Sequence, residues 1–208
     1  MATVPPSITD TEERSNRLRE IKDEVLALSV SPLYPYRTEN KYLPVIGEGN
    51  HHAHIVFIGE APGQNEAKTG KPFCGAAGKI LDELLSSIGL SRTDIYITNI
   101  LKDRPPKNRD PLPHEIKLYA PFLDRQLAII RPRVIATLGR FSMNYIFERL
   151  GIEDKLKPIS KMHGETFSAQ ASFGEVTIVP LYHPAVALYN RDTKKILLSD
   201  FQKLKPFL

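Results

Sequence analysis

The sequence predicts an α/β fold, a three-layer α/β/α arrangement around a central, mostly parallel, four-stranded sheet. Four short apolar runs recur along the 208-residue chain, and each is nearly continuous rather than alternating, as in strands covered on both faces. Between the runs, apolar residues recur at helical spacing. Strands that alternate with helices form right-handed crossovers and a largely parallel sheet between helical layers. The predicted strands are residues 55–58, 95–97, 134–138 and 176–179.

Five helices are predicted from apolar spacing and from residues that start or end helices. Thr9 and Glu12 have the spacing of a capping box, which places the first helix at residues 10–28. The others are residues 81–88, 119–130, 141–150 and 193–204. Pro121 is expected to kink the third of these five helices or to delay its start. Residues 29–54 contain three prolines and two glycines and are predicted to be an ordered loop or irregular strands.

Composition narrows the class of protein. Hydrophobic residues make up 41% and charged residues 25% of the chain, which excludes a wholly disordered protein. No apolar run approaches the roughly 18 residues of a membrane helix, and the first residues lack the pattern of a signal peptide. We therefore expect a soluble, cytoplasmic monomer with a flexible tail at residues 1–8 and one domain at residues 9–208. The net charge of +4 suits a polyanionic partner and equally suits an ordinary enzyme.

The chain has a single cysteine, Cys74. One cysteine excludes an internal disulfide, a multi-cysteine zinc site and a four-cysteine iron–sulfur cluster within one chain. Because no spacing pairs Cys74 with His183, we expect a buried structural thiol rather than a nucleophile. His51, His52 and His54 are expected to form a solvated turn, since nothing at ligand spacing completes a metal site. No metal site is predicted.

Distinctive residues follow three of the four predicted strands. The segment 59–63 (Gly-Glu-Ala-Pro-Gly) follows the first strand, Thr98 and Asn99 end the second, and His183 follows the fourth. Ligands bind at the carboxyl ends of parallel strands, so these residues are expected to meet in one cavity. From the residues alone we predict a ligand-binding α/β domain for a nucleotide-like molecule.

These motifs, in this order, resemble the uracil-DNA glycosylase superfamily and most closely its family 4. The matching segments are residues 59–63 with Glu66, residues 70–73, residues 98–99, residues 102–109 and residues 183–185. The similarity covers about residues 28–203, and although one short motif can arise by chance, the ordered set is specific. The resemblance implies a base-excision repair enzyme that hydrolyses the N-glycosidic bond of deoxyuridine in single- or double-stranded DNA, releasing uracil and leaving an abasic site.

The resemblance also implies roles for residues around the base. Expected catalytic residues are Glu60, Glu66, Asn99 and His183, and the base contacts add Ala61, Pro62, Gly63 and Phe73. Phe73 is expected to stack on the extruded uracil, and the Asn99 carboxamide to accept from its N3–H and donate to its O4. His183 is expected to donate, as a neutral imidazole, to the uracil O2, where negative charge develops. Glu60 is the first candidate for positioning the attacking water; Glu66, which also excludes the methyl group of thymine, is the second.

Contacts to DNA follow from the same resemblance. The expected phosphate contacts are Lys102, Arg104, Lys107, Arg109, Arg191, Lys194 and Lys195. Leu188 is expected to wedge into the space left by the flipped base, with Val186 as the alternative. Ala185 stands where the family has a serine that touches a DNA phosphate, so one such contact is expected to be missing.

The chain departs from family 4 in the residues that hold its cofactor. Members of that family usually carry a four-cysteine iron–sulfur cluster, and the aligned positions here are Leu28, Ser31, Asp103 and Tyr119. The cluster is therefore expected to be absent, with packing and hydrogen bonds in its place, and no other cofactor is expected. Because the cluster lies away from the base pocket in the family, its loss does not imply loss of activity.

Two alternatives remain open at this point. The chain could be a catalytically inactive DNA-binding member of the same fold, or a hydrolase of free nucleosides. The presence of Glu60, Asn99 and His183 favours an active enzyme over the first alternative. The basic loops and the candidate wedge favour a DNA substrate over the second.

Overall fold

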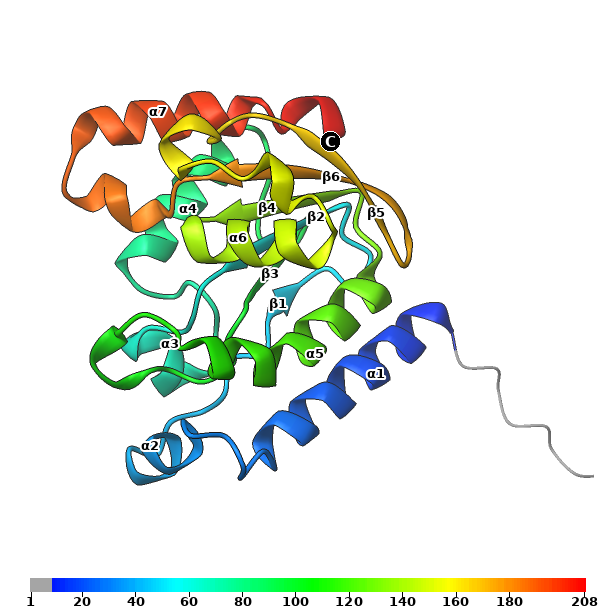
Figure 1. Ribbon diagram of the computed structural model, residues 1–208, viewed down its shortest axis with the longest axis vertical. Helices are drawn as coiled ribbons and strands as arrows, with labels where there is room; N and C mark the ends of the chain where they lie inside the picture. Colours follow the sequence, from blue (N-terminus) through cyan, green and yellow to red (C-terminus); the bar gives the residue numbers. More distant parts are fainter. Residues whose placement is uncertain (1–8) are drawn as a thin grey trace, which may run out of the picture.

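The computed structural model describes residues 9–208, and the expected tail at residues 1–8 lies outside them. Its centre is a six-stranded sheet with the order β1-β3-β2-β4-β6-β5 (Figure 1). The strands are β1 (Glu48–Gly49), β2 (Ile55–Gly59), β3 (Tyr96–Asn99), β4 (Val134–Leu138), β5 (Phe167–Ala171) and β6 (Gly174–Leu181).

The four predicted strands correspond to β2, β3, β4 and β6, and they pair in parallel. The prediction of a four-stranded sheet is wrong, because β1 and β5 add antiparallel strands at the two edges and make the sheet mixed. β1 is only two residues long. In β5 a single residue, Ala169, is buried, so this strand has no continuous apolar run. A search for such runs therefore misses both edges.

The helices are α1 (Asp10–Leu26), α2 (Tyr34–Glu39), α3 (Gln64–Thr69), α4 (Ala76–Ser86), α5 (Pro113–Ile130), α6 (Arg140–Arg149) and α7 (Arg191–Gln202). The five predicted helices are present as α1, α4, α5, α6 and α7. Pro121 lies inside α5 and does not delay its start. The prediction of loop or irregular strands at residues 29–54 is wrong where α2 forms, with Pro35 in its first turn, where a missing N–H is tolerated. Within residues 9–208, none of the helices is long and apolar enough to cross a membrane.

Helices cover both faces of the sheet. Val56 and Ile58 of β2 join a core cluster with α1, α5 and α6, whereas Ile55 and Phe57 join a second cluster with α4 and α7. Figure 1 shows α1 lying alongside α5 on the first of these faces. The predicted three-layer arrangement is therefore confirmed, and coverage of both faces explains why the central strands are continuously apolar.

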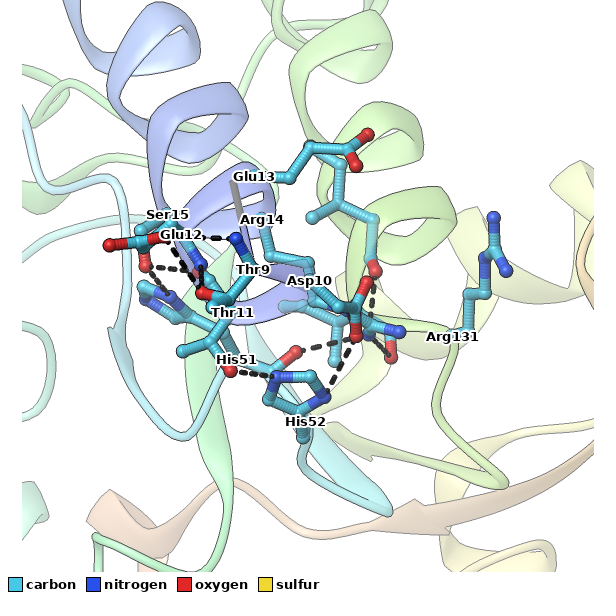
Figure 2. Close-up of polar contacts among 12 residues, drawn as sticks. Thr9, Asp10, Thr11, Glu12, Glu13, Arg14, Ser15, His51, His52 and Arg131 are labelled. Atoms are coloured by element: carbon cyan, nitrogen blue, oxygen red, sulfur yellow. Dashed lines mark hydrogen bonds and ion pairs between the residues drawn. The ribbon is translucent and has the colours of Figure 1, made fainter. Parts of the chain in front are cut away.

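The first turn of α1 is fixed by its own cap and by a neighbouring turn. Thr9 Oγ1 accepts from the Glu12 backbone N–H at 3.3 Å, and the Thr9 backbone N–H donates to Glu12 Oε2 at 2.9 Å, as the capping box predicts. His51 Nδ1 lies 3.0 Å from Ser15 Oγ, and His52 also contacts this turn (Figure 2). These histidines anchor a helix, and residues 9–208 contain no cluster of three or more potential metal-binding His, Cys, Asp or Glu side chains.

The chain connections bring three strand ends together. β2 leads through α3 and α4 to β3 on one side, whereas β4 leads through α6 and β5 to β6 on the other. Where such connections diverge, a crevice opens at the carboxyl ends of the parallel strands.

Candidate active site

A cavity of about 330 Å³ lies at the carboxyl ends of β2, β3 and β6. Its walls come from segments more than a hundred residues apart in the sequence. All eight residues predicted around the base line this cavity: Glu60, Ala61, Pro62, Gly63, Glu66, Phe73, Asn99 and His183. The prediction that distant strand ends meet in one cavity is therefore confirmed.

Gly59, the last residue of β2, lets two of these side chains approach each other. A methyl group on Gly59 would lie 2.3 Å from Asn99 Oδ1 and 2.8 Å from Phe73 Cζ. Both distances are too short for non-bonded atoms, so the Asn99 amide and the Phe73 ring meet over bare backbone. The pairing of Gly59 with Asn99 across β2 and β3 places them there. A flat ring can thus meet a carboxamide at its edge and an aromatic ring on its face.

The imidazole of His183 is held in one orientation. Its Nδ1 accepts a 3.2 Å hydrogen bond from the Ala185 backbone N–H, and its ring stacks on Phe73 with 5.6 Å between centroids and 29° between planes. Burial lowers the pKa of His183 to about 4, although the negative charge of Glu66 opposes this. The ring is therefore neutral near pH 7, and because Nδ1 accepts, the proton is assigned to Nε2. His183 can donate one hydrogen bond from Nε2.

Glu60 and Glu66 have different surroundings. Glu66 Oε1 accepts from the Gly75 backbone N–H at 2.8 Å, and Oε2 lies 2.6 Å from the position that a Gly63 Cβ would occupy. Glu66 is therefore fixed against two loops. Glu60 is half-buried, and burial raises its pKa to about 7. A carboxyl group that titrates near pH 7 can accept a proton from water under ordinary conditions.

Two charged residues around Glu60 were not predicted. Asp110 raises the pKa of Glu60 further and Arg140 lowers it, and the two pair with 2.7 Å between Arg140 Nη2 and Asp110 Oδ2. The exit of β4, which contains Arg140, looks like a plain strand-to-helix turn in the sequence. Its partner Asp110 is 30 residues away along the chain, so no local pattern could have identified the pair.

The cavity is completed by Ala77, Pro105, Asn108, Arg109 and Ala185. Asn108 was not predicted there. It follows Lys107, and both adopt left-handed backbone conformations with φ near 53° and 55°. Asn108 Oδ1 accepts from Arg104 Nε at 2.7 Å, which braces this strained turn at the cavity wall.

Comparison with known proteins identifies the family. Residues 46–205 match the family model described as the uracil DNA glycosylase superfamily. The chain is 46% identical over 189 residues to a type-4 uracil-DNA glycosylase of Sulfurisphaera tokodaii, covering 90% of this chain and 83% of that protein. It is 44% identical to the type-4 enzyme of Archaeoglobus fulgidus, covering 90% and 91%, and 37% identical to that of Thermotoga maritima, covering 94% and 96%.

The chain belongs to the uracil-DNA glycosylase superfamily. The identities to type-4 enzymes confirm the resemblance to family 4. Membership of the superfamily relates the cavity to nucleic-acid chemistry.

One predicted DNA contact of this superfamily member is wrong. Lys102 is fully buried, and its Nζ donates to Thr98 Oγ1 at 2.8 Å, to the Asn99 carbonyl at 2.7 Å and to Gln126 Oε1 at 2.5 Å. Burial lowers its pKa well below the ordinary value. These contacts with three acceptors hold Lys102 inside the fold, so it braces the strand end that carries Asn99 and cannot reach a phosphate.

The other cations predicted near β3 differ in how free their side chains are to contact a DNA phosphate. Arg104 is partly buried and donates to the hydroxyl groups of Tyr36 and Tyr42. Arg109 lines the cavity while it pairs with the buried Glu115, with 2.6 Å between Nη2 and Oε1. Lys107 is exposed.

The segment after β6 carries the remaining predictions. Lys194 pairs with Glu83 and Lys195 pairs with Asp192 at the surface. The side chain of Arg191 lies outside the described residues. Leu188 is 41% exposed, whereas Val186 packs on the second core cluster, so Leu188 is the better placed of the two wedge candidates. The neighbouring Tyr189, which sequence reasoning missed, is 90% exposed.

Three of the four positions aligned with the cluster cysteines of family 4, Ser31, Asp103 and Tyr119, form a buried polar network, whereas Leu28 packs against the hydrophobic core. Tyr119 Oη donates to Asp103 Oδ2 at 2.6 Å and lies 2.8 Å from Ser31 Oγ. Arg37 Nη1 pairs with Asp103 at 3.0 Å and also donates to the Val25 carbonyl at 2.8 Å. Iron–sulfur clusters need thiolate ligands, and these oxygens already bond one another. The residues present do not fit a cluster.

The prediction that Cys74 is a buried structural thiol is wrong. Cys74 is exposed, and its Sγ lies 3.3 Å from Thr69 Oγ1. The apolar neighbours Pro72 and Phe73 turn inward while the chain carries Cys74 outward, and adjacent residues commonly differ in this way in a tight loop.

Proposed function

We propose that this protein is a uracil-DNA glycosylase that hydrolyses the N-glycosidic bond of deoxyuridine in DNA, releasing uracil and leaving an abasic site. The observation that carries the proposal is the convergence of Asn99, Phe73 and His183 in one cavity over the bare backbone of Gly59. Its volume of about 330 Å³ lies in the range of small-molecule sites. The names of the type-4 relatives support the same activity.

Recognition of the base uses complementarity at an edge and at a face. The Asn99 carboxamide accepts from uracil N3–H and donates to O4, and Phe73 stacks on the ring. Cytosine presents the opposite donor and acceptor at these two positions, which leaves buried polar groups unpaired. Glu66, fixed by Gly75, forms the wall that excludes the methyl group of thymine.

The chemical step places water and charge on opposite sides of the scissile bond. Water attacks C1′ as the C1′–N1 bond breaks, and the bonding electron pair leaves with the uracil. The Nε2–H of His183 donates to O2, where part of the negative charge develops. Glu60 orients the water and accepts its proton. Glu66 is less suited to this role because one of its oxygens already accepts from the backbone of Gly75.

DNA binding uses cations around the cavity and an apolar wedge. Arg104, Lys107, Arg109, Arg191, Lys194 and Lys195 supply the phosphate contacts, without Lys102. Leu188 enters the space that the flipped base leaves. Residues 9–208 act as one domain of a monomeric, cytoplasmic protein. The protein works without an iron–sulfur cluster, because the Asp103 network supports the segments that the cluster holds in family 4.

The proposal is tested with oligonucleotides that contain one uracil, single-stranded and paired, followed by alkali to cut abasic sites. We expect strand cleavage with the native protein and none with thymine in place of uracil. Binding without cleavage would indicate an inactive DNA-binding member of the fold. Hydrolysis of free deoxyuridine without cleavage of either oligonucleotide would indicate a nucleoside hydrolase.

A further inference from the structure

The backbone of Phe73 is strained. Its φ of 48° places a residue with a large side chain in the left-handed region, which such residues rarely adopt. The ring is nevertheless fixed, because it is 6% exposed and packs between Gly59 and His183. Strain of this kind persists only where surrounding groups determine the conformation. Some group must therefore hold the backbone around Phe73.

Arg92 contacts this backbone from outside the cavity. It lies in the loop between α4 and β3, and its Nη1 donates to the Pro72 carbonyl at 3.0 Å while Nη2 donates to the Phe73 carbonyl. Its Nε donates to Asp82 Oδ1 of α4 at 2.6 Å. A single planar guanidinium thus joins two consecutive carbonyls of the strained segment to the side of α4.

The Phe73 carbonyl is also in close contact with α4 itself. A Cβ on Gly78 would lie 1.6 Å from the Phe73 carbonyl oxygen, so the helix packs directly against it. The oxygen is therefore in contact with both the bare backbone of Gly78 and the guanidinium of Arg92. Any movement of this carbonyl rotates the backbone that carries the Phe73 ring.

We propose that Arg92 is a positioning residue for the base site, acting through the backbone of Phe73. Arg92 does not line the cavity, so it reaches a bound base only through the 72–73 segment. The inference rests on the proposed role of Phe73 as the stacking surface for uracil. Lysine cannot replace Arg92, because an ammonium group lacks the planar fork that reaches both carbonyls and Asp82 together.

The test compares Arg92→Ala and Arg92→Lys with the native enzyme. The measurements are the inhibition constant of free uracil, the single-turnover rate of uracil release and the affinity for an oligonucleotide without uracil. Misplacement of a binding group by a remote change can cost up to about 100-fold, so we expect both variants to lose roughly 10- to 100-fold in uracil affinity and in rate. Affinity for the oligonucleotide without uracil should stay unchanged, because Arg92 contacts no predicted DNA-binding residue.

A matched control separates positioning from loss of a surface ion pair. Arg125 pairs with Glu24 through two hydrogen bonds of 2.5 and 2.7 Å, and these side chains are 42% and 49% exposed. Arg125→Ala therefore removes a comparable pair elsewhere and should leave uracil affinity unchanged. If Arg125→Ala and Arg92→Ala lower uracil affinity equally, the effect is general destabilisation and the positioning role is wrong.

Phe73→Ala separates failure of this inference from failure of the proposed function. If the native protein releases no uracil, the proposed function fails; if it does and Phe73→Ala leaves uracil affinity unchanged, Phe73 is not the stacking surface and the role of Arg92 fails with it. If Phe73→Ala loses affinity while Arg92→Ala and Arg92→Lys retain it, only the role of Arg92 fails. If Arg92 acts through Phe73, the double variant Arg92→Ala/Phe73→Ala should lose no more affinity than Phe73→Ala alone. Additive losses of uracil affinity in the double variant would show that Arg92 does not act through Phe73.

Discussion

The Ala185 backbone N–H donates a 3.2 Å hydrogen bond to Nδ1 of His183. This contact makes Nδ1 an acceptor and leaves the proton on Nε2, the nitrogen available to a bound base. Burial holds the pKa of His183 at about 4, so near pH 7 the imidazole is neutral and carries one proton. That proton, on Nε2, is available for a hydrogen bond to a developing oxyanion. The short turn after β6 therefore determines both the orientation of the imidazole and which of its nitrogens carries the proton.

His183→Ala should slow uracil release roughly 100- to 1000-fold, as expected for loss of a main oxyanion donor. The measurement is the single-turnover rate on a uracil oligonucleotide. His52→Ala, in the turn beside α1, is the control and should keep the native rate. An unchanged rate in His183→Ala would remove this residue from the mechanism.

The rate should rise with pH through about 7, because Glu60 must be ionised to accept a proton from water and its pKa is raised to about 7. Below that pH the carboxyl group is protonated and inactive as a base. Protonation of His183, with its pKa of about 4, affects the rate only in more acidic solution. Glu60→Gln should abolish the rise near pH 7. A variant that keeps the same pH–rate profile would show that another group accepts the proton.

Asp110 and Arg140 allow the same assignment to be tested without removing Glu60. Asp110 raises the pKa of Glu60 and Arg140 lowers it. Asp110→Asn should therefore shift the midpoint of the pH–rate profile to lower pH, and Arg140→Gln should shift it to higher pH. Shifts in the same direction, or none, would contradict the assignment of the midpoint to Glu60.

Asn99→Asp should weaken discrimination against cytosine. A carboxylate offers only acceptors, so it no longer donates to uracil O4 and can accept from the amino group of cytosine. The measurement is the ratio of single-turnover rates on oligonucleotides with one uracil or one cytosine. A variant that retains full selectivity would show that another group reads the edge of the base.

The sequence predicted the parallel strands and the residues of the cavity because both depend on local patterns. Continuous apolar runs mark β2, β3, β4 and β6, and polar residues directly after them lie at one edge of the sheet. Lys102 was assigned wrongly for the same reason. It stands in a charged, proline-bearing segment typical of an exposed loop, and its acceptor Gln126 is 24 residues away, so nothing nearby in the sequence indicates burial.

The left-handed backbone of Phe73 and its contact with Arg92 were equally beyond local patterns. Phenylalanine carries no signal for a positive φ, and Arg92 looks like an ordinary surface arginine at the start of a loop. The contact between Arg92 and the Phe73 backbone depends on how α4 packs along the sheet. That packing is not a property of any short segment of the sequence. Residues that act through others are therefore the hardest part of a site to predict from one sequence.

Asp103→Ala should destabilise the fold far more than loss of a surface ion pair does. Removing one partner of a buried pair leaves Arg37 buried and uncompensated, which costs about 3–5 kcal/mol, whereas an exposed pair contributes about 0–1 kcal/mol. Tyr119→Phe, which removes one hydroxyl from the network, should cost about 1–3 kcal/mol. The measurement is the free energy of unfolding in urea, with Glu24→Ala as the surface control. Iron content is determined on the same samples: stoichiometric iron in the native protein, or equal stability of Asp103→Ala and Glu24→Ala, would contradict the view that this network supports the segments in place of a cluster.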